Sequence, residues 1–308
     1  MMKRIIISYL VLVVVCMVPR AQIFTSVSVK KISGSAPADV KIAAVSPQGD
    51  YILTTTGSNK GLNKIELSTG QVQELASSAG AGFQPVISND GKQVIYRDVQ
   101  FTKNHIRMTS LKNVLVDSRS EIELSAPVRE VKAYGFHNNT AYTMNEDDDI
   151  QVQKGMSRSL VDVTAPRVFL EDLQLMLYKD GETVRLSPNG TEVSYIWPSL
   201  SPNGKQILYY VSGRGAYVCD LDGGNVIFID HDCRAPKWYD DNTIIGMNDE
   251  DNGEILLSSC IVAYTLDGMS QRLTAPATMT MYPQCSQKKD MVVCSTSYGE
   301  IFIIHLEK

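Results

Sequence analysis

Carboxylate side chains gather in one short acidic stretch in the last quarter of the chain. Asp249, Asp251 and Glu254 flank Gly253 in the run Asn248 to Glu254. Alternate carboxylates in a loop can converge on a hard cation such as calcium, which prefers oxygen ligands. These three residues are therefore the metal candidates, and calcium is the only cofactor suggested. Since the full EF-hand loop pattern is absent, hydrated turns are the favoured interpretation.

A second set of side chains has the chemistry to hold an organic ligand. Aromatic rings and a guanidinium group can stack on a sugar ring or on a peptide. The alternative role of the same side chains is to fill space between neighbouring sheets, and we favour that role for each of them. The candidate ligand-binding residues are Phe83, Tyr195, Trp197, Arg234 and Tyr282.

Two classes of function are disfavoured by the sequence. The chain contains no Gly-x-Ser-x-Gly motif, which serine hydrolases use to expose their nucleophile, so no catalytic residue is expected. With a net charge of -5 and a pI of about 5.5, it also lacks the basic surface that phosphate backbones require. Nucleic acid is therefore not an expected partner.

The N-terminus has the pattern of a signal peptide. Lys3 and Arg4 precede the apolar run 5–18, which is too short to span a bilayer, and Ala21 precedes the expected cleavage site. We therefore predict a signal peptide at 1–21 and an exported protein, periplasmic or extracellular. Lipid anchoring through Cys16 is disfavoured because the preceding Val15 is not a small residue.

The remaining cysteines do not suggest a disulfide framework. An odd number of them, confined to the last third of the chain, remains after the signal peptide is removed. Several lie inside apolar strand patterns, where buried free thiols are expected. The sequence assigns no pairing to Cys219, Cys233, Cys260, Cys285 and Cys294.

Internal repetition is the strongest pattern in the chain. A turn motif of proline, any residue, an apolar residue, serine and a polar turn recurs with varying fidelity. Its six copies start 42, 48, 65, 38 and 47 residues apart. They are 43–49 (AAVSPQG), 85–91 (PVISNDG), 133–139 (AYGFHNN), 198–204 (PSLSPNG), 236–242 (PKWYDDN) and 283–289 (PQCSQKK).

The repeats predict a β-propeller. A short apolar strand follows each motif, for example 93–97 after the second copy and 243–247 after the fifth. Several repeats add a second hairpin around Asp-Gly or Thr-Gly, so each repeat forms a four-stranded antiparallel blade. Such sheets hide their faces by stacking around an axis. We predict a single all-β domain over 22–308 with six blades and an insertion near 150–172; seven blades is the alternative. The alternating strand 23–32 is expected to close the last blade.

The run PSLSPNGKQILYYVSGRGAYVCDLDGGN, residues 198–225, resembles the repeat of TolB-like propellers, which prolyl oligopeptidase-type propeller domains share. The resemblance covers nearly the whole chain after the signal peptide. It implies a periplasmic or cell-surface scaffold that binds proteins, peptides or glycans, and it transfers no catalytic residue. Some TolB-like propellers resemble lyases that hold a divalent metal with histidines, but only His105 and His231 are expected in loops of one face. His137 and His305 are expected elsewhere.

Function is expected at one mouth of the central channel. Loops between strands two and three of each blade emerge there, including the acidic loops 145–149 and 248–254, together with loops that join blades. We predict a monomeric, non-catalytic propeller that binds a protein, peptide or glycan through these loops. The alternative is a metal-dependent polysaccharide or oligosaccharide lyase.

Overall fold

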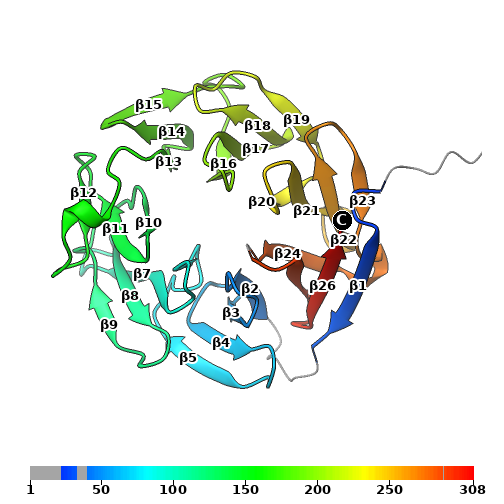
Figure 1. The fold of residues 1–308 in the computed structure, drawn as a ribbon, viewed down its shortest axis with the longest axis horizontal. Coiled ribbons are helices and arrows are strands. Elements are labelled where there is room, and N and C mark those ends of the chain that lie inside the picture. The colour runs from blue at the N-terminus through cyan, green and yellow to red at the C-terminus, as the bar shows by residue number, and fades with distance from the viewer. Residues whose placement is uncertain (1–21, 33–39, 287) are drawn as a thin grey trace, which may run out of the picture.

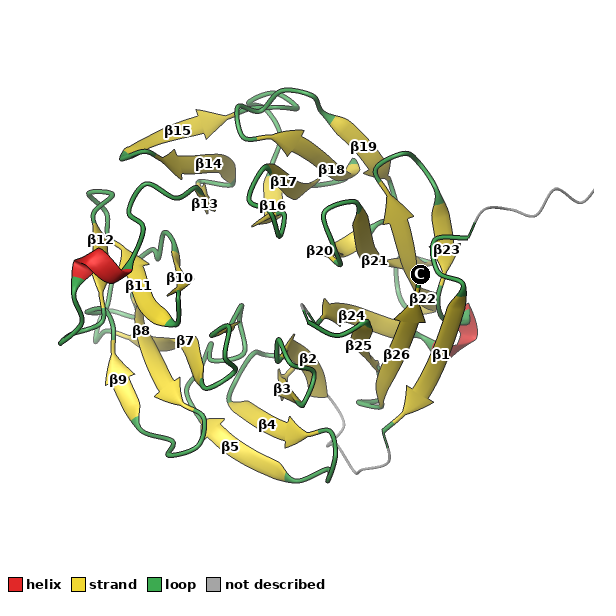
Figure 2. Ribbon diagram, in the orientation of Figure 1, coloured by secondary structure: helices red, strands yellow, loops and turns green. Residues whose placement is uncertain are grey.

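A computed structural model describes residues 22–32, 40–286 and 288–308. The predicted signal peptide at 1–21 and Cys16 lie outside the described residues. The described chain forms seven antiparallel sheets arranged around a central channel (Figure 1). Two short 3-10 turns, Arg158–Leu160 and Pro276–Thr278, are the helical segments in Figure 2. Among the described residues, no helix is long and apolar enough to cross a membrane.

Each sheet is one blade, with its first strand at the channel and its last strand at the rim (Figure 1). Blade 1 contains β2 (Val40–Val45), β3 (Tyr51–Thr56), β4 (Leu62–Glu66) and β5 (Val72–Ala76). Blade 2 contains β6 (Val86–Ile87), β7 (Gln93–Phe101), β8 (Arg107–Leu115) and β9 (Glu121–Glu123). Blade 3 contains β10 (Tyr134–His137), β11 (Thr140–Met144) and β12 (Ile150–Val152). Blade 4 contains β13 (Arg167–Glu171), β14 (Gln174–Lys179) and β15 (Glu182–Leu186).

The remaining three blades all have four strands. Blade 5 contains β16 (Tyr195–Leu200), β17 (Gln206–Val211), β18 (Gly215–Asp220) and β19 (Ile227–Asp230). Blade 6 contains β20 (Arg234–Trp238), β21 (Thr243–Asp251), β22 (Leu256–Thr265) and β23 (Ser270–Arg272). Blade 7 contains β24 (Thr280–Cys285), β25 (Met291–Thr296), β26 (Ile301–Glu307) and β1 (Ser26–Lys31).

The serine of the repeat motif closes the turn between the first two strands of a blade. The buried Ser46 hydroxyl accepts hydrogen bonds from the backbone N–H groups of Asp50 and Tyr51, at 3.0 and 3.2 Å. Ser88 and Ser201 accept equivalent bonds in blades 2 and 5. Because these hydroxyls satisfy buried backbone donors, the motif marks the turn reliably. Each of the six predicted motif copies overlaps the first strand of a blade and ends before the second strand begins.

The blade count is seven, the alternative considered above, rather than six. The segment 150–172, interpreted from sequence as an insertion, contains the outer strand of blade 3 and the inner strand of blade 4. Blade 4 was not predicted as a separate repeat, because the turn between β13 and β14 does not contain the motif. Asp172 and Leu173 form that turn with φ angles of 50° and 59°, a conformation that leucine rarely adopts.

The N-terminal strand closes the ring, as predicted. β1 pairs antiparallel with β26, from Ser26 opposite Glu307 to Lys31 opposite Phe302. It thereby becomes the fourth strand of blade 7, and Figure 1 shows the two ends of the described chain side by side there. The pairing satisfies the outer edge of β26, which would otherwise be exposed.

Apolar side chains form one cluster at each interface between neighbouring blades. Seven such clusters of buried residues occur around the ring. The cluster between blades 1 and 2, for example, joins Leu53 and Leu62 to Val94 and Tyr96. The core of the molecule is therefore a ring of interfaces, because no sheet covers both of its own faces.

The five cysteines after the predicted signal peptide are free thiols. Cys219, Cys260 and Cys294 are buried in strands, as expected, and Cys233 is also buried. Burial raises the pKa of the Cys219 and Cys294 thiols to about 12. Thiols that remain protonated at neutral pH react slowly, so we interpret these residues as core side chains.

Candidate functional site

Two long hairpins distinguish one face of the ring. In six blades the connection between the second and third strands emerges on one face, which we call the hairpin face. In blade 4 the turn between β13 and β14 lies on that face instead, because the Leu173 carbonyl accepts a hydrogen bond from the Tyr195 N–H at the start of β16. β7 and β8 of blade 2 remain paired out to Phe101 and Arg107, and β21 and β22 of blade 6 remain paired out to Asp251 and Leu256. The sequence predicted that these second strands end at Arg97 and Met247. The added pairs make both hairpins longer than their counterparts in the other blades.

The tips of the two long hairpins carry exposed apolar side chains. Phe101 is 65% exposed and Ile106 40% exposed on the blade 2 tip. Ile255 is 63% exposed and Leu257 49% exposed on the blade 6 tip. Tyr298 adds an exposed aromatic ring, at 74%, on the turn between β25 and β26. The tips of these hairpins are therefore a candidate contact surface.

Positive φ angles recur at the residues that precede the motif prolines. Gln84, Trp197, Ala235 and Tyr282 have φ angles of 53°, 54°, 46° and 54°. In blades 5, 6 and 7 the same place is a register irregularity in the first strand. Non-glycine residues adopt such angles at an energetic cost and cluster at functional sites. The bulges interrupt the alternation of side chains in the innermost strands.

One predicted ligand-binding residue, Tyr195, is buried in the core. Tyr195 is fully buried, its ring lies 5.6 Å from that of Tyr209, and its hydroxyl donates to the Gly190 carbonyl at 2.7 Å. It lies two positions before Trp197 on β16, and strand alternation alone would place both side chains on one face. The bulge at Trp197 breaks that alternation.

Trp197 occupies an intermediate position between the core and the channel mouth. Its ring lies 5.4 Å from the Tyr210 ring, and it packs against the apolar cluster between blades 5 and 6. The space-filling role favoured from the sequence therefore accounts for part of its surface. Burial raises the pKa of Tyr210, and the charges of Arg234 and Asp249 also act on it.

Arg234 and Asp249 form an ion pair at the mouth. Arg234 Nη1 lies 2.9 Å from Asp249 Oδ2, and the Asp249 side chain is only 7% exposed. Its other oxygen, Oδ1, is buried without a hydrogen-bond partner among the described residues. Burial raises the pKa of Asp249 above its ordinary value, and the Arg234 charge opposes that shift. The pair therefore joins a predicted ligand-binding residue to a predicted metal ligand.

Tyr282 and Phe83 are, like Arg234, exposed members of the predicted ligand-binding set. Tyr282 is 40% exposed, its N–H donates to Met247 Sδ at 3.5 Å, and the Lys41 ammonium lies 5.9 Å from its ring. Phe83 is 41% exposed and lies 5.2 Å from the Arg97 guanidinium. These contacts place cations against aromatic faces on blades 7 and 2. We call Phe83, Trp197, Arg234, Asp249 and Tyr282 the mouth residues.

The metal candidates are not assembled into a site by the fold. Asp249 and Asp251 belong to β21 rather than to a loop, and Asp251 Oδ1 accepts a hydrogen bond from the Gly253 N–H at 2.8 Å. Glu254 lies in the following turn, where its N–H donates to Asn252. Within the described ranges, no group of three His, Cys, Asp or Glu side chains is placed to hold a metal ion.

Replacing Arg234 with alanine is expected to destabilise the protein in a pH-dependent way. At pH 7 the variant leaves a buried carboxylate unpaired, and we expect the free energy of unfolding to fall by about 1–2 kcal/mol, less than for a fully buried pair because Arg234 is half-exposed. Without the arginine the already raised pKa of Asp249 rises further. Ionisation of a group with a raised pKa costs stability as pH rises, so the deficit shrinks toward pH 4.

Urea unfolding of the variant and the wild type at both pH values measures this effect. The control is the double variant Arg234→Ala with Asp249→Asn, which removes the unpaired charge and is expected to recover most of the loss at pH 7. The expectation fails if the loss of unfolding free energy in Arg234→Ala is the same at both pH values. It also fails if the double variant is no more stable than Arg234→Ala, because the Arg234–Asp249 ion pair would then not contribute to stability.

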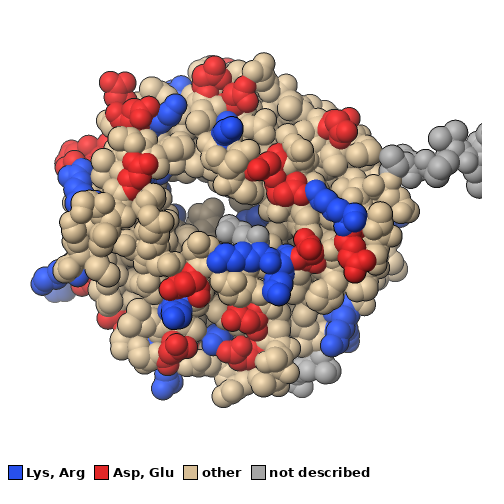
Figure 3. Space-filling model, in the orientation of Figure 1, with Lys and Arg blue, Asp and Glu red and all other residues tan. Residues whose placement is uncertain are grey.

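Charges of both signs are interspersed on the face seen in Figure 3, and the channel remains open at the centre of the space-filling view. No side of this face is uniformly basic or acidic (Figure 3). The distribution fits the modest net charge of -5. Because charges of both signs alternate on this face, it does not present a field of one sign that would attract a highly charged polymer.

Comparison with solved structures identifies the fold. A putative TolB from Agrobacterium tumefaciens matches with a TM-score of 0.51 at 14% identity, over 92% of this chain and 98% of that chain. The β-propeller domain of Cps50 (Swd1) from Myceliophteria thermophila matches with a TM-score of 0.54 at 10% identity, over 90% and 98%. An oligogalacturonate lyase from Vibrio parahaemolyticus matches with a TM-score of 0.46 at 12% identity, over 85% and 76%, too low to support an argument.

Sequence comparison adds no family assignment. No family model matches the chain, and no curated protein matches it. At 10 to 14% identity, the structural similarity shows the fold alone. What the similar proteins bind is not transferred to this chain. The chain has a TolB-like β-propeller fold, as its repeat motif predicted.

Proposed function

We propose that this chain is an exported, monomeric and non-catalytic propeller that binds a partner protein on its hairpin face. The observation that carries the proposal is the pair of long hairpins with exposed apolar tips, Phe101 and Ile106 on blade 2 and Ile255 and Leu257 on blade 6. Such groups remain in water only at a free-energy cost, which a partner that covers them would remove.

The spacing of the tips favours a folded protein over a glycan or a short peptide. Blades 2 and 6 are separated by blades 7 and 1 along the shorter arc of the ring (Figure 1). A molecule that covers both tips must therefore span several blades. Tyr282 on blade 7 lies between the two hairpins, and together with Arg234 and Phe83 it offers polar and aromatic contacts to such a partner.

Site-specific photo-cross-linking in the producing cells tests the proposal. A benzophenone amino acid placed at Phe101 or at Ile255 is expected to capture the same partner. Val72 is the matched control, because it is 61% exposed on the outer strand of blade 1, away from the hairpin face. Capture at Val72 as strong as at the tips, or different molecules captured at the two tips, would contradict the proposal.

Replacing both tips tests the energetic contribution. The double variant Phe101→Ser with Ile255→Ser is expected to bind the captured partner at least about tenfold more weakly, since burying each large apolar side chain contributes roughly 1.5–3 kcal/mol. The lyase alternative makes a different prediction, the manganese- or calcium-dependent eliminative cleavage of uronate oligosaccharides. That activity in the purified protein would overturn the non-catalytic assignment.

A further inference from the structure

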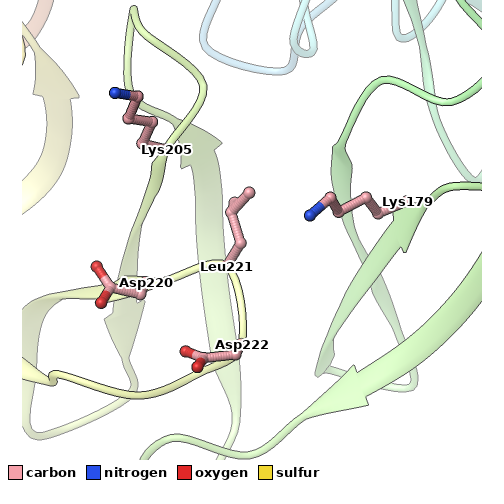
Figure 4. Close-up of a pocket in the computed structure, with 5 residues that line it drawn as sticks. All are labelled: Lys179, Lys205, Asp220, Leu221 and Asp222. Atoms are coloured by element: carbon pink, nitrogen blue, oxygen red, sulfur yellow. The ribbon is translucent and has the colours of Figure 1, made fainter.

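The cavity between blades 4 and 5 contains charged groups of both signs. It has a volume of about 370 Å³ and is lined by Lys179, Lys205, Asp220, Leu221 and Asp222. Figure 4 shows the two lysines and the two aspartates around Leu221. Because these charges balance, the cavity does not favour a ligand of either sign.

Arg97 at the channel mouth has no such balancing charge. It is a partly buried residue of β7, and among the described residues no carboxylate lies within 4.0 Å of its guanidinium group. By contrast, Lys112 on the neighbouring strand β8 lies 2.9 Å from Asp98. Arg234 on blade 6 is paired with Asp249. Arg97 is therefore a cation that has lost part of its hydration without gaining a counter-charge from the described chain.

Two aromatic rings contact the Arg97 guanidinium group. Its Cζ atom lies 5.2 Å from the centre of the Phe83 ring and 5.3 Å from the centre of the Tyr134 ring. The Arg97 Nε–H donates to the Tyr134 hydroxyl at 3.2 Å, and this hydroxyl donates to the Gln84 carbonyl at 2.8 Å. Groups from blade 2, blade 3 and the connection before β6 thus hold the side chain in place, which lowers the entropy cost of binding a ligand.

These contacts leave one end of the guanidinium group free. Nε is bonded to Tyr134, whereas Nη1 and Nη2 have no hydrogen-bond partner in the described parts of the chain, and neither nitrogen is fully buried. Arg167 shows the opposite case, because its Nη1 and Nη2 donate to the carbonyls of Ala165 and Asp162, each at 2.7 Å. The free end of Arg97 presents two parallel N–H groups, which match the two oxygens of one carboxylate.

Arg97 lies on the hairpin face, beside the start of the innermost strands. Val86 at the start of β6 pairs with Ile95, two residues before Arg97, and Tyr134 is the first residue of β10. Phe101 follows Arg97 by four residues on β7, so strand alternation places both side chains on one face, about 13 Å apart along the strand. A partner that covers the blade 2 tip therefore needs only about four extended residues to reach Arg97.

We propose that the Nη1 and Nη2 groups of Arg97 bind a carboxylate group of the partner protein. The inference rests on the proposed function, because the partner that covers the hairpin tips supplies the carboxylate. A singly charged carboxylate suits the site better than a phosphate, since Arg97 is a single cation and Lys112 on the next strand is already paired with Asp98. The rings of Phe83 and Tyr134 shield the new ion pair from water, which strengthens it.

Titration of the ¹⁵N-labelled protein with three small peptides tests the proposal. Ac-Thr-Glu-Thr-NH₂ carries only a side-chain carboxylate, Ac-Thr-Gln-Thr-OH carries only a terminal carboxylate, and Ac-Thr-Gln-Thr-NH₂ carries neither. We expect a carboxylate peptide to shift the Arg97 Nε–Hε resonance and to bind about tenfold more tightly than the neutral peptide. A difference in affinity between the two carboxylate peptides identifies which kind of carboxylate the partner supplies.

Two variants separate the planar pair of donors from charge in general. Arg97→Lys keeps the positive charge but loses the fork, and it is expected to bind the carboxylate peptide about fivefold or more weakly. Arg119→Gln is the matched control, because it removes one exposed cation from the turn after β8 of the same blade; it is expected to leave the affinity within about twofold. If Arg97→Lys does not fold, Phe83→Ala replaces it, with the same expected direction, because it removes one of the two rings that hold Arg97.

The inference fails if neither carboxylate peptide binds more tightly than the neutral peptide at millimolar concentration. It also fails if Arg97→Lys binds as tightly as the wild type, or if inorganic phosphate binds at Arg97 more tightly than both carboxylate peptides. The double variant Phe101→Ser with Ile255→Ser keeps Arg97, so it is expected to bind the carboxylate peptide normally although it loses affinity for the partner. Failure at Arg97 and failure at the hairpin tips are therefore separate results.

Discussion

Replacing Phe24 with alanine is expected to lower the free energy of unfolding by about 3–5 kcal/mol, the usual cost of removing a buried phenylalanine. Phe24 is 1% exposed and packs edge-on against the Tyr239 ring at 5.2 Å. Its backbone N–H donates to Gln271 Oε1 at 2.8 Å, and its carbonyl accepts from Gln271 Nε2 at 3.1 Å. These contacts connect the start of β1 to blade 6, so Phe24 links the two blades at the closure.

Urea unfolding measures this loss, and limited proteolysis reports where the ring opens. Val29→Ala on the same strand is the control, because Val29 is 45% exposed and its replacement should change stability by no more than about 0.5 kcal/mol. We expect the Phe24 variant to be cleaved first near β1. A loss below about 1 kcal/mol would mean that the N-terminal strand contributes little to holding the ring closed.

The fold was predictable because its turns use residues with few alternatives. A serine that satisfies buried backbone donors, followed by Asn-Gly or Asp-Gly, marks the first turn of blades 2 and 5 with little ambiguity. Blade 4 has no such residues in its first turn, where Asp172 and Leu173 adopt positive φ angles. The residue types do not predict that conformation, which the two-residue hairpin between β13 and β14 requires.

The candidate site was less predictable because its geometry depends on irregular backbone. The bulge at Trp197 moves that side chain out of phase with Tyr195, so two residues that share a strand have different environments. Carboxylates are uncommon in strands, and the acidic run after Met247 therefore predicted a loop, although Asp249 and Asp251 are strand residues. The exposed tip residues Phe101 and Ile255 were not predicted as site residues, because the predicted second strands of both hairpins ended before the tips. Continued alternation in 93–101 was the available signal.

Adding a single methyl group at Gly246 is expected to disturb the mouth of the channel through blade 6. A Cβ atom at this position would lie 2.4 Å from Cys233 Sγ and 3.4 Å from the Arg234 carbonyl oxygen. Cys233 is fully buried, and Gly246 lies within β21, so neither group can move away freely. We expect Gly246→Ala to cost about 1–3 kcal/mol, as overpacking of a closed core usually does.

A suppressor distinguishes this steric cause from a general effect on the strand. Cys233→Ala removes the sulfur atom that the new methyl group meets, so the double variant Gly246→Ala with Cys233→Ala is expected to be more stable than Gly246→Ala alone. Gly268→Ala is a control for the loss of glycine itself, because no atom lies within 4 Å of its added Cβ. The φ of 90° at Gly268 makes alanine locally strained there, and Cys233→Ala is not expected to relieve that strain. Urea unfolding of Gly246→Ala, of Gly268→Ala and of each combined with Cys233→Ala measures these differences. If Cys233→Ala fails to restore stability to Gly246→Ala, the close approach of β20 to β21 is not what requires glycine there. If Cys233→Ala does restore stability, the close approach of Cys233 to Gly246 is what requires glycine there. That approach holds β20, which carries Arg234, against β21, which carries Asp249.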